Sequence, residues 1–143
     1  LDGFTVIDDS KNFVIDNEGN YNLNDGRILE VSFIKPHELK GIEENKYTKY
    51  FDYDKISSRL NVRFRQTGDY LCINDNFQKK TLKEYFIQEK IPVYMRSEIP
   101  VIADGNHILW ILGYRISAYY KVTKETKKIV KITLRRNEKW QKE

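Results

Sequence analysis

Residues 60–69 read LNVRFRQTGD, and the first six alternate strictly between apolar and polar side chains. A period of two is typical of a β-strand that buries one face. The pattern therefore predicts a strand whose apolar side chains point into a core and whose arginines, Arg63 and Arg65, project from the other face. Gly68 and Asp69 follow as a tight turn, since both residue types are favoured in turns.

A helix is predicted further along the chain. Residues 81–84 read TLKE, which is the Ser/Thr-x-x-Glu pattern of a capping box. Apolar side chains then recur at helical spacing and predict a buried stripe formed by Leu82, Tyr85 and Phe86. Pro92 ends this helix, because proline does not fit a helix interior. We expect a short second helix over residues 94–98.

Short apolar or alternating segments elsewhere indicate strands in both halves of the chain. We expect these strands at residues 4–7, 13–15, 28–34, 50–53, 99–103, 107–112 and 129–134, with a hairpin turn at 104–106, a polar loop at 38–46 and helical turns within 54–60 and 124–127. Since strands and helices do not alternate as they do in parallel α/β proteins, the fold class is α+β.

The composition describes one globular domain of ordinary size, or two small ones. The 143 residues are 40% hydrophobic, with no apolar run of the ~20 residues that cross a bilayer. The N-terminus shows no basic segment followed by an apolar one, so we expect no signal peptide and no membrane, and a single cysteine fits a reducing cytoplasm. The single cysteine, Cys72, excludes an internal disulfide. Leu1 is not a natural start, which suggests a piece of a longer protein.

No catalytic constellation emerges from the residue types. A phosphate-binding Gly-Lys-Ser/Thr loop, a Ser-His-Asp set and a Ser-Gly-Gly-x-Asp-Ser adenylation loop are all absent from the sequence. The carboxylate pairs, Asp8 with Asp9 and Asp52 with Asp54, are near turns and are interpreted as turn and capping residues. His107 is interpreted as structural and Cys72 as buried. We therefore expect no catalytic residue, metal or cofactor in this chain.

Charge is distributed unevenly along the chain. Residues 1–75 hold 10 Lys and Arg against 14 Asp and Glu, whereas residues 76–143 hold 15 against 7. A basic half suggests a polyanionic partner such as nucleic acid, although a solvated surface gives the same count.

Eight basic side chains are candidates for phosphate contacts, because lysine, arginine and helix N-terminal amides are the usual phosphate donors. They are Arg65, Lys79, Lys80, Lys83, Lys90, Arg96, Arg115 and Lys121. A structural role stays open for each, since Arg65 and Asp69 could form an internal ion pair and Arg96 or Arg115 could be buried. Gly68, Asp69 and Gly113 are interpreted as turn residues between these cations.

Several blocks resemble, in the same order, the C-terminal domain of tRNA(Ile)-lysidine synthetases. They are RFRQTGD at 63–69, KKTLKEYF at 79–86, KIP at 90–92 with Arg96 and IPV at 99–101, WILGYRI at 110–116, KVTKETK at 121–127 and, upstream, FDYDKI at 51–56. The family's Pro-Leu-Gly is replaced by Cys72-Ile73-Asn74, and the glycine before the two lysines is missing. Residues 1–45 do not match the family well.

The resemblance implies a function and a fold. The family joins lysine to the wobble cytidine of a minor isoleucine tRNA, with ATP and Mg²⁺ bound in an N-terminal catalytic domain that is not in this sequence. The C-terminal domain is implied to hold the tRNA near its acceptor stem. Its implied fold is a three-layer α+β arrangement with a β-sandwich of unusual topology and a few short helices, similar to a domain of the phenylalanyl-tRNA synthetase β subunit.

The expected domain spans residues 51–135, followed by a charged tail at 136–143. Residues 1–50 are either a strand-rich part of the same domain or the end of a preceding linker. The alternative to tRNA binding is a structural or dimerisation domain, in which Tyr119, Tyr120 and the acidic first half form a homodimer surface.

Overall fold

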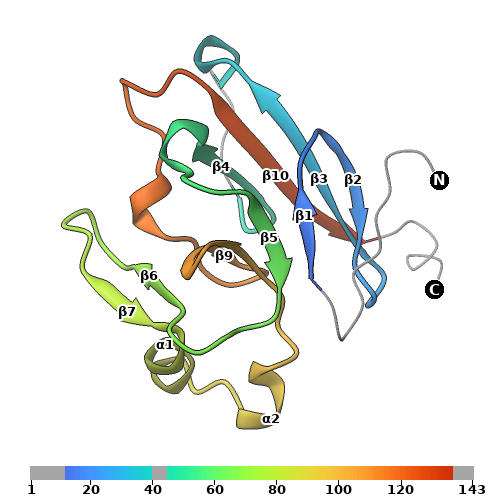
Figure 1. Cartoon of the computed structure of the whole chain (residues 1–143), viewed down its shortest axis with the longest axis vertical. Coiled ribbons are helices and arrows are strands. Elements are labelled where there is room, and N and C mark those ends of the chain that lie inside the picture. The colour runs from blue at the N-terminus through green and yellow to red at the C-terminus, as the bar shows by residue number, and fades with distance from the viewer. Residues whose placement is uncertain (1–11, 40–44, 137–143) are drawn as a thin grey trace.

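A computed structural model describes residues 12–39 and 45–136, which form two β-sheets and a small helical layer (Figure 1). The first sheet has six strands in the order β1 (Phe13–Ile15), β5 (Leu60–Arg63), β8 (Val101–Asp104), β9 (His107–Ile111), β6 (Tyr70–Cys72) and β7 (Lys79–Thr81). The second has four strands in the order β2 (Gly19–Asn22), β3 (Arg27–Ile34), β10 (Ile129–Arg136) and β4 (Thr48–Asp52).

Neighbouring strands are antiparallel throughout, except that β6 and β9 are parallel and pair only through Tyr70 and His107. The helices are α1 (Leu82–Gln88) and α2 (Val93–Arg96), with three single 3-10 turns, η1 (Pro36–Leu39), η2 (Tyr53–Lys55) and η3 (Ala118–Tyr120). Both α-helices lie at the lower end of the molecule in Figure 1, whereas η1 lies at the upper end.

The six-stranded sheet separates two hydrophobic cores. On one face, Ile102 and Trp110 pack with Leu29 and Phe51 of the four-stranded sheet. On the other face, residues next to them in sequence pack against α1, including Val101 and Ile111. Because adjacent strand residues point to opposite faces, β8 and β9 are buried on both sides. The arrangement is therefore three layers, helices over one sheet that packs on another.

Local sequence signals explain both ends of α1. Thr81 Oγ1 accepts from the Glu84 amide and Glu84 Oε1 accepts from the Thr81 amide, each at 3.0 Å, so the predicted capping box is confirmed. At the other end, the Lys90 amide donates to Ile87 and the Ile91 amide to Phe86, which is the Schellman pattern. Lys90 has φ +57°, a conformation that glycine usually supplies at this position.

Most of the predicted elements are confirmed within a few residues, including the buried stripe of α1, the hairpin between β8 and β9, and the final strand. The helical turn expected at 124–127 is wrong. Thr123 caps this segment as predicted, by accepting from the Glu125 amide, but residues 123–126 form a β-turn closed by the Thr126 amide and the Thr123 carbonyl. The strand expected at 4–7 lies outside the described residues, as do most of the predicted tail and part of the polar loop.

Candidate functional site

Arg63 is buried, which corrects the prediction that it projects from the sheet with Arg65. Its two Nη atoms donate to the two carboxylate oxygens of Asp69 at 2.9 Å, and the side chains are 6% and 0% exposed. Arg63 also donates to the backbone carbonyls of Phe64 and Gly105, both at 2.9 Å. Asp69 therefore forms its internal ion pair with Arg63 and not with Arg65, the partner considered from the sequence. The charge of Arg65 is left without a carboxylate partner among the described residues.

Asp69 also fixes the turn that follows β5. Its carboxylate accepts from the Gln66 amide at 2.7 Å and from Asn106 Nδ2 at 2.9 Å. Gly68 has φ +92°, a left-handed conformation that side chains with a Cβ rarely adopt. The turn at residues 65–69 is thus held by a buried charge and by the hairpin that carries Asn106.

This turn forms one wall of a groove of about 550 Å³, which we call the basic groove. The start of α1 and the end of α2 form the other walls, and the groove is lined by Arg65, Gln66, Thr67, Gly68, Asp69, Thr81, Leu82, Lys83 and Arg96. Three of the eight predicted cations therefore meet here, although they are far apart in sequence. None of the three forms an ion pair with any residue that the structure describes.

Arginines in the basic groove are positioned by weak or partial contacts that leave donors free. The Arg65 guanidinium lies 5.7 Å from the centre of the Phe86 ring. Arg96 Nε donates to the Ile91 carbonyl at 2.9 Å, which holds the side chain while its terminal nitrogens stay available. Free guanidinium nitrogens are well suited to bind the oxygens of a phosphate group.

Lys79 and Lys80 point to opposite faces of β7, as successive strand residues do. Lys80 Nζ donates to the Gln88 side chain on α1. Lys79 Nζ lies 4.7 Å above the Tyr70 ring on the other face. The amides of Thr81 and Glu84 are already paired within the capping box, so they add nothing to an anion site beside these lysines. Lys90 is exposed at the end of α1.

Arg115 and Lys121 line a second cavity of about 460 Å³, together with Lys49 from β4. Arg115 Nη2 donates to the Ile73 carbonyl at 2.7 Å, and Lys121 forms an ion pair of 3.1 Å with Asp75. Gly113 has φ +83° in the turn that leads to Arg115. Sequence analysis missed Lys49, because it belongs to the acidic half and only the pairing of β4 with β10 gives its position.

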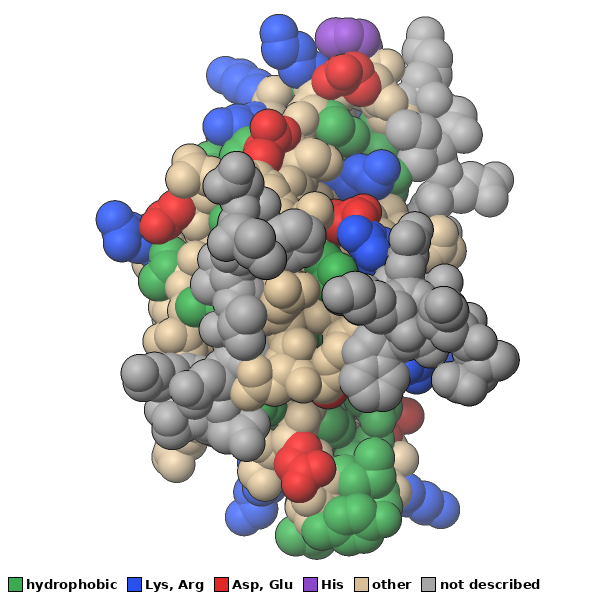
Figure 2. All heavy atoms as spheres, turned by 90° about the vertical axis from the view of Figure 1, so that its right-hand side faces the viewer, with side chains coloured by type: hydrophobic (Ala, Val, Ile, Leu, Met, Phe, Trp, Pro, Cys, Tyr) green, Lys and Arg blue, Asp and Glu red, His purple; other side chains and the backbone are tan. Residues whose placement is uncertain are grey.

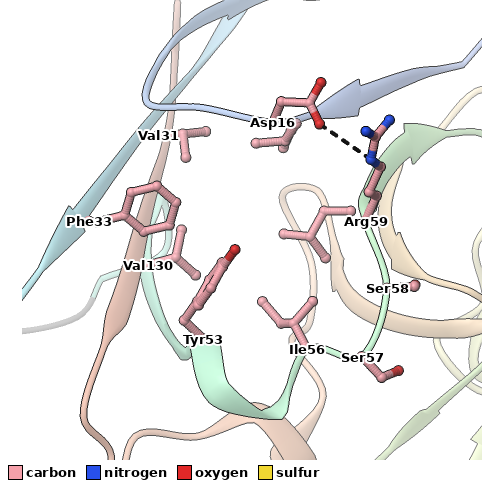
Figure 3. Close-up of a pocket in the computed structure, with 11 residues that line it drawn as sticks. Asp16, Val31, Phe33, Tyr53, Ile56, Ser57, Ser58, Arg59 and Val130 are labelled. Atoms are coloured by element: carbon pink, nitrogen blue, oxygen red, sulfur yellow. Dashed lines mark ion pairs between the residues drawn. The ribbon is translucent and has the colours of Figure 1, made fainter.

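A third cavity, of about 370 Å³, opens between the two sheets and is mainly apolar (Figure 3). Phe33, Tyr53 and Val130 point into it, and an Asp16–Arg59 ion pair of 3.7 Å crosses its edge. It contains none of the eight predicted cations, and its one arginine already faces a carboxylate. We therefore leave it out of the candidate site.

The groups considered for chemistry have structural partners. His107 Nε2 lies 2.8 Å from Ser117 Oγ, and burial lowers the pKa of His107 to about 4. Burial by itself would raise the pKa of Asp104, but hydrogen bonds from Ser57, Ser58 and Tyr120 keep it below its ordinary value. Within residues 12–39 and 45–136, no three His, Cys, Asp or Glu side chains are arranged so that they could hold a metal ion.

Asp52 and Cys72 are placed as the sequence predicted. Asp52 caps η2 by accepting from the Asp54 amide, and Cys72 is buried.

Tyr120 is buried, which removes it from the predicted dimer surface. Its hydroxyl donates to Asp104 at 2.8 Å. Nor does any helix in the described part of the chain combine the length and apolar character needed to cross a bilayer.

The fold and the groove define a class of protein, a three-layer α+β domain with a basic groove beside its helices. The chain belongs to the family described as the TilS substrate C-terminal domain, whose model matches residues 60–134. This match confirms the resemblance that the ordered sequence blocks indicated.

The relatives are tRNA(Ile)-lysidine synthases. That of Clostridium tetani is 37% identical over 116 residues, which cover 81% of this chain and 25% of the relative. That of Clostridium perfringens is 38% identical over 134 residues, covering 92% and 27%. The chain thus spans about a quarter of the length of these relatives.

A solved structure titled as the TilS C-terminal domain has the same fold. It matches with a TM-score of 0.71 at 23% identity, covering 88% of this chain and 98% of that chain. The predicted α+β class is confirmed by this match, while the likeness to a domain of the phenylalanyl-tRNA synthetase β subunit stays a prediction.

Proposed function

We propose that this chain is the tRNA-binding part of a tRNA(Ile)-lysidine synthetase that works in the cytoplasm. Its task is to hold the acceptor-stem region of a minor isoleucine tRNA. Ligation of lysine to the wobble cytidine takes place in the N-terminal catalytic domain of the same protein, where ATP and Mg²⁺ are used. The relatives' names and the family membership support this reading.

The observation that carries the proposal is the basic groove. Arg65, Lys83 and Arg96 converge on it from three separate segments, and no described carboxylate neutralises them. Cations that no carboxylate neutralises make the potential of an open groove positive and so favour the binding of an anion there. Two guanidinium groups and one ammonium group can donate hydrogen bonds to the phosphate oxygens of an RNA backbone. Such contacts position an RNA without reading its bases.

Four of the other predicted cations lie outside the basic groove and are proposed as additional phosphate contacts. Lys80 and Lys90 are on or next to α1, whereas Arg115 and Lys121 line the second cavity with Lys49. Lys121 is partly neutralised by Asp75, so we expect it to contribute less than the groove residues.

The test is tRNA binding by the full-length enzyme that carries this domain, measured by fluorescence anisotropy at several salt concentrations. Arg65→Ala, Lys83→Ala and Arg96→Ala should each weaken binding about fivefold or more, and each should lower the log–log salt slope by about one. Adenylation of lysine with ATP should be unchanged, because the catalytic domain is intact. Unchanged tRNA affinity in all three variants would defeat the proposal.

Lys35→Ala is the matched control. Lys35 is exposed beside η1, at the opposite end of the molecule from α1 and α2, and it has no ion pair with a described residue (Figure 1). The Lys35→Ala substitution removes one positive charge, as each groove substitution does. A general electrostatic effect would therefore lower the tRNA affinity of this variant as well. We expect its tRNA affinity to stay within twofold of the parent.

A second candidate function is association with another protein surface, including the catalytic domain or a second copy. Apolar side chains gather at the lower end of the molecule in Figure 2, the end that α2 occupies in Figure 1. Val93 and Tyr94 on α2 are 69% and 76% exposed. Val93→Ser with Tyr94→Ser should weaken self-association or domain contact in sedimentation experiments if this surface is buried in the assembly, while tRNA affinity at the groove persists.

A further inference from the structure

Phe77 is presented at the tip of the β6–β7 hairpin in an unusual backbone conformation. Its φ is +59°, which is rare for a bulky side chain, and the residue is 45% exposed. The tip is held by Asn74, whose side chain accepts from the amides of Asn76 and Gln78 at 3.0 and 3.2 Å. Its carbonyl accepts from the Phe77 amide at 2.9 Å. The Phe77 ring is thus held partly exposed to solvent at the end of a turn that several hydrogen bonds stabilise.

Phe77 is one end of a row of four rings that we call the aromatic strip: Tyr70, His107, Tyr119 and Phe77. Tyr70 and His107 have their centroids 4.6 Å apart, and His107 and Tyr119 5.2 Å apart. Phe77 meets Tyr119 edge to face at 5.3 Å. The four rings come from the β6–β7 hairpin, β9 and η3, and all four are at least partly accessible.

Two lysines lie on the aromatic strip. Lys55 Nζ is 5.6 Å from the centre of the Phe77 ring and 5.2 Å from that of Tyr119, and it donates to the Tyr119 carbonyl. Lys79 Nζ is 4.7 Å from the centre of Tyr70. Neither lysine forms an ion pair with a carboxylate of the described residues. Each ammonium group is therefore free to bind an anion while its aromatic contact fixes its position.

The aromatic strip and the basic groove are on opposite faces of the β6–β7 hairpin. Tyr70 and Lys79 point to one face, whereas Leu71 and Lys80 point to the face that α1 covers. The two surfaces can thus contact different parts of one RNA molecule.

We propose that the aromatic strip binds an unpaired nucleotide, whose base stacks on the Phe77 ring beside Tyr119 while Lys55 and Lys79 contact the flanking phosphates. Bases inside a duplex are stacked on both sides and offer no free face, so exposed rings favour a single-stranded segment. The cations beside the rings match a phosphate backbone and disfavour a purely apolar partner. This inference deepens the proposed function, because it adds a single-strand contact to the groove that binds paired RNA.

The test uses the 143-residue chain and two fluorescent probes, a single-stranded RNA hexamer and a duplex of the same sequence. Phe77→Gly removes the ring and suits the left-handed backbone, so the fold should be kept or stabilised. It should lower affinity for the single strand about tenfold and leave affinity for the duplex unchanged. Tyr47→Ala removes another half-exposed aromatic ring, on the loop before β4, and should change neither affinity.

Two results would overturn the inference: equal single-strand affinity in Phe77→Gly and the parent chain, or an equal loss for both probes. Arg65→Ala keeps the two proposals apart, since it should weaken the duplex and spare the single strand. If Arg65→Ala has no effect while Phe77→Gly weakens only the single strand, the groove proposal fails and the aromatic strip stands.

Discussion

Replacing Asp69 with Asn keeps the shape of the side chain but removes the negative charge that faces Arg63. The guanidinium would stay buried, 6% exposed, with two of its donors pointing at an uncharged amide. Removing one partner of a buried ion pair destabilises a protein by about 3–5 kcal/mol, a large part of the ~5–15 kcal/mol that stabilises a domain. With a denaturant dependence of about 2 kcal/mol per molar urea, the unfolding midpoint should fall by about 1.5–2.5 M.

Urea unfolding followed by far-ultraviolet circular dichroism measures this change. Asp75→Asn is the matched control, since the same substitution there breaks an ion pair with Lys121 in which the Asp75 side chain is 84% exposed. An exposed pair contributes below about 1 kcal/mol, so its midpoint should barely move. A shift of less than about 0.5 M for Asp69→Asn would show that the Phe64 and Gly105 carbonyls satisfy Arg63 without the carboxylate.

The same variant separates two effects on RNA binding. Removing a negative charge beside the basic groove should raise affinity for a polyanion by simple electrostatics. Asp69 also holds the Gln66 amide and Asn106, so its loss should loosen the turn that carries Arg65. We expect the second effect to dominate and tRNA affinity to fall; a rise would refute the positioning role of this turn.

Three further predictions concern α1 and the aromatic strip. Lys90→Gly should raise the free energy of unfolding by about 1 kcal/mol in urea, because glycine adopts the φ of +57° without strain. Thr81→Ala should lower it by about 1 kcal/mol through loss of the capping hydrogen bond to Glu84, and Thr81→Ser should restore most of it. The pKa of His107 should be about 4 by NMR, against an ordinary value of 6.5. The unfolded chain then binds more protons between those values, so stability present above pH 6.5 should decline as the pH falls toward 4. That decline in stability should be smaller in His107→Gln. A Lys90→Gly variant that is less stable than the parent would contradict the first prediction, and a His107 pKa near 6.5 would contradict the last.

Alternation along residues 60–65 predicted a strand correctly and the environment of Arg63 wrongly. The inference assumed that the face opposite a core is solvent, as in a two-layer sheet. In this fold α1 covers part of the second face, so the central strands β8 and β9 are buried on both sides. Arg63 also needs Gly105 as a partner, and no local pattern shows that the β8–β9 turn comes back to that position.

The capping box and proline signals, in contrast, defined α1 and α2 well, because both depend only on residues that are close in sequence. Local signals do not, however, predict which basic side chains lie close together in the folded chain. Arg65 and Arg96 are separated by a hairpin and two helices, and they come together only because α2 returns to the turn at 65–69. Sequence analysis could identify the basic residues, but their grouping depends on tertiary contacts.

The placement of β10 has a consequence for how the chain folds. This strand lies between β3 and β4, with Arg136 opposite Arg27 and Ile129 opposite both Ile34 and Asp52. The centre of the four-stranded sheet is thus closed by pairing β10 with two strands much earlier in the sequence, and loop-closure entropy must be lost before these hydrogen bonds form. We expect slow, all-or-none refolding on the scale of milliseconds to seconds, with little of this sheet protected from hydrogen exchange until β10 has paired.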